Sequence, residues 1–91
     1  MKEFNLKNTL VLWIALVNYL GSNPLIGKDA VQLAVYRLES KLEQAGICNV
    51  VMLFTSEFSY TLQYECEGLQ IVTQLAKEKV DSVDVKQILK L

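Results

Sequence analysis

The sequence predicts an α+β domain in which two N-terminal helices precede an antiparallel β-hairpin and one or two C-terminal helices follow, an ααββαα order. Three observations lead to this prediction. Apolar residues recur at helical spacing as far as Ala45, the apolar period changes to two after Ile47, and good helix formers return after Gly68. Because 91 residues is the size of one domain, we expect residues 1–91 to fold as a single domain.

The first helix is expected over residues 3–20, with Gly21 ending it. One apolar stripe of this helix should face the core, and its members are Leu6, Leu10, Trp13, Val17 and Leu20. The opposite side is also apolar, since it carries Phe4, Val11, Leu12, Ala15 and Tyr19. A side that meets water is normally polar, so this second apolar side needs a cover.

The second helix is expected to begin at Asp29 and to end before Gly46. Asp29 can accept hydrogen bonds from the free N–H groups of the first turn, and Gln32 three residues later resembles a capping box. Apolar residues with a spacing of four and three place one face toward the core, namely Val31, Val35, Leu38, Leu42 and Ala45.

A β-hairpin follows, with strands at 47–55 and 60–66. The second strand alternates apolar and polar residues, which is typical of a half-buried strand, whereas the first is almost continuously apolar. A three-residue loop at 56–58 gives a register in which every pair on one face is apolar. The expected pairs are Phe54 with Tyr60, Met52 with Leu62, Val50 with Tyr64, and Cys48 with Cys66.

The segment after Gly68 fits either a helix or a third strand over residues 69–75. The helix formers at 74–79 favour a helix, while Ile71, Val72 and Thr73 favour a strand. We expect the helix. A last helix over residues 83–91 is expected to be capped by Asp81 or Ser82.

The residue types argue against catalysis, so we expect a non-enzymatic protein with no cofactor and no metal site. Histidine, the usual proton carrier near neutral pH and the commonest transition-metal ligand, is absent. The four glycines are scattered and form no phosphate-binding loop. Glu65 and Glu67 lie two apart on a strand and are the alternative carboxylate pair for a small enzyme.

Cys48 and Cys66 have three possible interpretations. The first is two free thiols, the second is a cross-strand disulfide, and the third and least favoured is a pair of metal ligands.

The second helix, which contains Tyr36-Arg37-Leu38-Glu39 and ends in Ala45-Gly46-Ile47, is followed by the hairpin and by Glu67-Gly68. This order resembles a winged-helix regulator, and the resemblance implies DNA binding through the second helix. The sequence departs from that family because residues 21–30 leave no room for its additional short helix. The helix also balances Lys28, Arg37 and Lys41 with acidic residues. With a net charge of −1 as well, binding to nucleic acid is not expected.

The surplus of apolar residues is the positive evidence for a partner. The predicted elements can cover only one side of the first helix and one side of the hairpin. A homodimer or a subunit of a larger assembly is therefore expected to cover the second faces. The simplest form is a twofold homodimer through the first helix, in which Ala15 allows the paired backbones to approach closely. The interface residues are Phe4, Val11, Leu12, Ala15, Tyr19, Val51 and Leu53.

A cytoplasmic location is expected from the low cysteine content, and the apolar run at 10–17 is too short to span a bilayer. A peripheral membrane protein is the remaining alternative.

Overall fold

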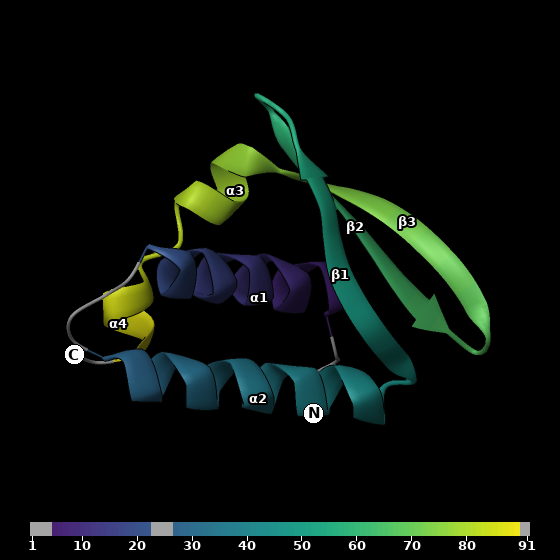
Figure 1. Ribbon diagram of the computed structural model, residues 1–91, viewed down its shortest axis with the longest axis horizontal. Helices are drawn as coiled ribbons and strands as arrows, with labels where there is room; N and C mark the ends of the chain where they lie inside the picture. The colour runs from purple at the N-terminus through teal and green to yellow at the C-terminus, as the bar shows by residue number, and fades with distance from the viewer. Residues whose placement is uncertain (1–4, 23–26, 90–91) are drawn as a thin grey trace.

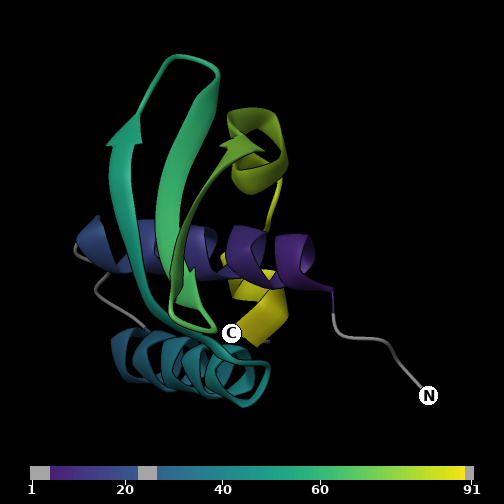
Figure 2. The same ribbon diagram turned by 90° about the vertical axis from the view of Figure 1, so that its right-hand side faces the viewer.

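The computed structural model describes residues 5–22 and 27–89 and confirms an α+β arrangement (Figure 1). Its elements, in chain order, are α1 (Leu6–Gly21), α2 (Lys28–Gln44), β1 (Ile47–Thr55), β2 (Ser59–Cys66), β3 (Leu69–Ala76), α3 (Lys77–Asp81) and α4 (Val85–Leu89). The three strands form one antiparallel sheet in the order β1-β2-β3. All the helices lie on one side of that sheet, as the two views show (Figures 1 and 2).

Helix α1 occupies the centre of the helical layer, between α2 and α3 (Figure 1). Asn5 caps it, because its Oδ1 accepts a hydrogen bond of 3.0 Å from the Asn8 N–H. Contacts with α2, α3 and α4, together with the hydrogen bond from Asn18 to Tyr60 of the sheet, explain why its buried residues extend beyond one stripe. They are Leu10, Trp13, Ile14, Ala15 and Leu16.

The expected register of the hairpin is wrong except at one pair. Met52 lies opposite Leu62 as expected, but Phe54 lies opposite Thr61 and Cys48 opposite Glu65. Two irregularities in β1, one between Cys48 and Val51 and the other between Met52 and Phe54, each add one residue to β1 relative to β2. The alternation of apolar and polar residues does not reveal such bulges. The expected register, which was chosen so that apolar residues faced each other, therefore misplaces these pairs.

Residues 69–76 form strand β3 and not the expected helix. Cys66 lies opposite Leu69, with Glu67 and Gly68 forming a two-residue turn. Both turn residues have positive φ, 53° and 80°, as a type I′ turn requires. This turn returns the chain directly alongside β2, and the β-branched residues from Ile71 to Thr73 then outweigh the helix formers that follow them.

Three helix ends also differ from the expected ones. Gly27, with φ of 83°, precedes α2 as its N-terminal cap residue, so Asp29 lies inside the first turn and does not cap. Helix α3 is a five-residue segment that begins only at Lys77. The N-terminus of α4 is capped by Asp84 and not by Asp81 or Ser82, because Asp84 Oδ1 accepts a hydrogen bond of 3.2 Å from the Gln87 N–H.

Candidate interaction surface

The sheet has one face against the helices and one face without a helix over it. Figure 2 looks onto the second face, and the helical layer lies behind the strands. Side chains alternate between the two faces of a strand, and residues directly opposite each other in an antiparallel pair share a face. The buried residues Tyr60, Leu62 and Tyr64 therefore point toward the helices, so both tyrosines belong to the core.

The outer sheet face is made by the residues that alternate with these buried ones and by their neighbours on β1 and β3. Its members are Val51, Leu53, Phe54, Thr61, Gln63, Val72 and Gln74. Four of them are large apolar side chains with high exposure: Val51 at 46%, Leu53 at 45%, Phe54 at 57% and Val72 at 57%. None of these seven, which form the centre of the face, is charged. Toward its ends the same face also carries Ser59, Glu65 and Gln70, of which Glu65 is charged. Several exposed apolar side chains on one sheet face are typical of a protein-binding surface.

Thr61 lies at the centre of the outer sheet face and is nevertheless 97% buried, since its exposed fraction is 3%. Phe54 of β1 and Gln74 of β3 flank it as its direct cross-strand neighbours. Its Oγ1 atom has no hydrogen-bond partner among residues 5–22 and 27–89. A buried hydroxyl without a partner is destabilising, so this position is polar at a cost in folding free energy.

The structure divides the seven expected interface residues between the two layers. Ala15 is buried within the chain, and Val11, Leu12 and Tyr19 are half-buried. Val11 and Tyr19 pack against the core of the chain itself. Only Val51 and Leu53, both on the sheet, are exposed. Phe4 lies outside the described residues.

Sequence reasoning missed Phe54 and Val72 as members of this surface. The expected register placed Phe54 opposite Tyr60 on the core face, and the bulge before it turns its side chain outward. Val72 was placed in a helix, although the β-branched run around it was the available signal. The outer sheet face therefore spans all three strands, and not only the two that were expected.

The two cysteines do not lie opposite each other. Cys48 pairs with Glu65, and Cys66 pairs with Ile47, so the two side chains point to opposite faces of the sheet. Both are free thiols, which decides against the cross-strand disulfide. The Cys48 Sγ lies 4.0 Å from the Glu65 Oε2. Within the described residues, no group of three or more His, Cys, Asp or Glu side chains could hold a metal ion.

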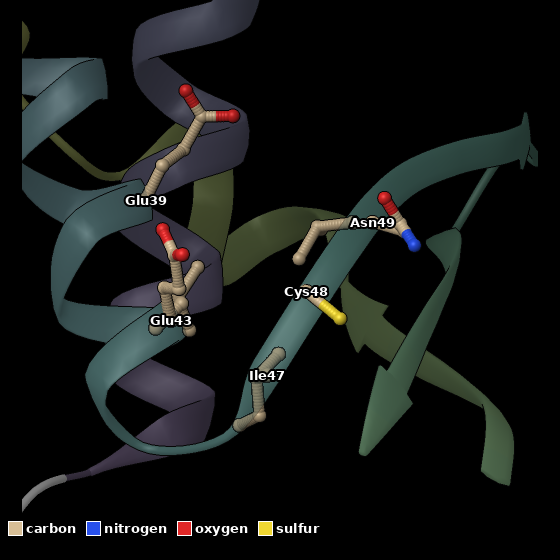
Figure 3. Close-up of a pocket in the computed structure, with 7 residues that line it drawn as sticks. Glu39, Glu43, Ile47, Cys48 and Asn49 are labelled. Carbon is tan, nitrogen blue, oxygen red and sulfur yellow. The ribbon is translucent and has the colours of Figure 1, made fainter. Parts of the chain in front are cut away.

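A cleft of about 300 Å³ lies between the end of α2 and the start of β1 (Figure 3). Glu39 and Glu43 line it from α2, and Ile47, Cys48 and Asn49 line it from β1. Figure 3 shows that the Cys48 sulfur and the Asn49 amide point away from the two glutamates. The Cys48 thiol and the Asn49 amide are therefore not directed at the two carboxylates. Of the alternative carboxylate pair, Glu65 is half-buried and Glu67 lies in the β2–β3 turn, so the two do not form a site on one strand.

A small polar network joins α1, β2 and α3. The Tyr60 hydroxyl accepts a hydrogen bond of 3.2 Å from Asn18 Nδ2 and donates one of 3.4 Å to Asp81 Oδ1. Burial is the main cause that raises the pKa of Tyr60 above its usual value of 10, and the negative charge of Asp81 raises it further. The Lys77 Nζ lies 6.0 Å from the centre of the Tyr60 ring. These contacts fix the short α3 against the rest of the fold.

No helix within the described part of the chain is long and apolar enough to cross a membrane. On α2, the basic residues that the winged-helix resemblance would use are exposed, but so are Asp29, Glu39 and Glu43. Neither a family model, nor a curated protein, nor a solved structure matches the chain.

Proposed function

We propose that this chain is a non-enzymatic protein-interaction module that forms a homodimer by stacking the outer sheet faces of two copies. The observation that supports the proposal is the set of four exposed apolar side chains, Val51, Leu53, Phe54 and Val72, on a face whose centre carries no charged side chain. Homo-oligomers most often have twofold symmetry, in which the same patch of each copy meets its equivalent. Two antiparallel sheets can stack in this way about 10 Å apart.

The charge distribution favours a second copy as the occupant of the outer sheet face. A partner surface with charged groups would lose their hydration against Val51, Phe54 and Val72 without gaining an ion pair. A second copy presents the same apolar centre, without a charged side chain among Val51, Phe54 and Val72. At the centre of this face, the polar side-chain groups are the amides of Gln63 and Gln74 and the hydroxyl of Thr61.

The size of the face sets the strength that we expect. Strands of eight residues, spaced as in any sheet, give a face of about 26 Å by 14 Å. A standard stable interface buries about 800 Å² on each partner, which is roughly twice the flat area of this face. We therefore expect a weak and reversible dimer, which is compatible with a regulatory role in which concentration controls assembly.

Sedimentation equilibrium of the wild type and of Phe54→Glu tests this proposal, with Leu33→Glu as the matched control. Leu33 is 51% exposed on α2, close to the 57% of Phe54, but it lies in the helical layer. The wild type and Leu33→Glu are expected to dimerise in parallel as concentration rises. Phe54→Glu should weaken the dimer by about tenfold or more, because a carboxylate would be buried without a partner.

Two results would contradict the proposal. One is a wild type that stays monomeric up to about 1 mM, the concentration at which a binding free energy of only about −4 kcal/mol gives a half-occupied site. The other is a dimer that Phe54→Glu leaves intact. Far-UV circular dichroism of each variant ensures that a loss of association is not a loss of fold.

A further inference from the structure

The edge strand β3 is regular, whereas the edge strand β1 is interrupted by bulges. Strand β1 carries two irregularities in its register, and Asn49 within it has a positive φ of 55°. Strand β3 pairs with β2 through eight consecutive residues without a register shift. Like β1, it contains no proline and no charged residue, so it has none of the three protective features. Bulges, prolines and charges are the usual means by which proteins prevent an edge strand from pairing with another chain.

The register identifies the backbone groups that point out of this edge. A type I′ turn places a hydrogen bond between the Cys66 carbonyl and the Leu69 N–H, so this pair begins the hydrogen-bonded series. The Lys77 N–H donates to the Phe58 carbonyl at 2.9 Å, which continues the same series at the other end of β3. Hydrogen-bonded and non-bonded pairs alternate in an antiparallel ladder. The backbone N–H and C=O groups of Gln70, Val72 and Gln74 therefore point away from β2.

No other strand among the described residues satisfies these groups, since β2 is the only strand neighbour of β3. The side chains beside the edge are also incompletely covered. Leu69 is 68% exposed, and Ile71, which lies opposite the buried Tyr64, is only half-buried. An additional strand would pair with the backbone groups and would cover these apolar side chains.

We propose that the β3 edge binds an extended, uncharged segment of a partner polypeptide as a fourth, antiparallel strand. Only an extended chain presents donors and acceptors at the spacing of Gln70, Val72 and Gln74. An uncharged segment with apolar side chains at alternate positions fits beside Ile71 and Leu69 and meets no charge on β3. The edge stays open when two copies stack through their outer sheet faces, so this proposal does not depend on the homodimer.

A synthetic peptide with the sequence of residues 69–76, flanked by lysines and carrying a fluorophore, serves as the probe. Paired antiparallel about Val72, it places a valine opposite Val72 and a glutamine opposite each of Gln70 and Gln74. We expect saturable binding by fluorescence anisotropy. A peptide N-methylated at its central valine should bind about tenfold more weakly or worse, because it loses one hydrogen bond to the edge and gains a clash.

The protein variant Val72→Pro removes the matching donor on the other side of the interface. The Val72 N–H takes no part in the ladder with β2, so the sheet keeps its own hydrogen bonds. Val72→Pro should lose peptide binding, while Phe54→Glu, on the opposite edge strand, should keep it. If Val72→Pro does not fold, the pair of peptides on the wild-type protein decides the matter alone.

Absence of peptide binding, or equal binding of the plain and N-methylated peptides, would overturn the proposal. Binding that Phe54→Glu abolishes and Val72→Pro spares would place the peptide on the outer sheet face and would overturn it as well. The homodimer is measured separately by sedimentation, so failure of one proposal is distinguishable from failure of the other.

Discussion

Replacing Thr61 by valine is expected to stabilise the protein. Valine has the shape of threonine with a methyl group in place of the hydroxyl, and the Thr61 Oγ1 is buried without a partner in the described structure. A buried polar group without a hydrogen bond costs about 1–3 kcal/mol, so Thr61→Val should recover an amount in that range. A chain of 91 residues has a total stability of roughly 5–13 kcal/mol, which makes the change easy to resolve.

Urea unfolding followed by circular dichroism measures this gain. With a slope of about 2 kcal/mol/M, a gain of 2 kcal/mol raises the midpoint by about 1 M without changing the slope. Thr55→Val is the control, because Thr55 is exposed and its hydroxyl donates to the Met52 Sδ at 3.6 Å. We expect it to change the stability by less than about 0.5 kcal/mol. A destabilising effect of Thr61→Val would contradict this reasoning, because it would mean that the Thr61 hydroxyl makes a hydrogen bond in the folded protein.

The remaining predictions concern the polar network, the β2–β3 turn and the cysteines. Tyr60→Phe should cost about 1 kcal/mol in urea unfolding at pH 7, through loss of the hydroxyl's hydrogen bonds. Because the pKa of Tyr60 is raised in the folded state, Tyr60 of the unfolded chain ionises first as the pH rises. The wild type should therefore lose stability from about pH 10 up to the folded pKa. Tyr60→Phe should lose less stability over this range. Glu67→Asn should raise the thermal midpoint, because asparagine tolerates the φ of 53° at this turn, and a gain of about 0.5 kcal/mol corresponds to roughly 2–4 °C. Thiol titration of the native protein under non-reducing conditions should find both Cys48 and Cys66 reactive, and a single or absent thiol would contradict their placement on opposite faces.

The helices and the core strand could be predicted from the sequence because their signals are periodic. The spacing of apolar residues placed α1 and α2 within a few residues of their observed bounds, and the strict alternation around Leu62 identified the central strand. These patterns indicate which side chains of a segment face the core. They do not depend on which other segments pack beside it.

The parts that could not be predicted depend on contacts between segments. The bulge before Phe54 reverses which side of β1 faces the core, and nothing in an alternating pattern marks it. The Glu67-Gly68 turn makes β3 a strand by returning it beside β2, although helix formers follow. The second side of α1 is apolar because α2, α3 and α4 surround it. Assuming only one covered side for each helix therefore overestimates the apolar surface that a partner must cover.

A concentration series of methyl NMR spectra tests the central claim most directly, since it reads individual side chains of the outer sheet face. As the protein is concentrated, the methyl signals of Val51, Leu53 and Val72 should shift together along one binding curve, while those of Leu33 on α2 stay fixed. Signals that stay unchanged throughout, or that shift at Val11 and Leu12 of α1 instead, would contradict an interface on the sheet.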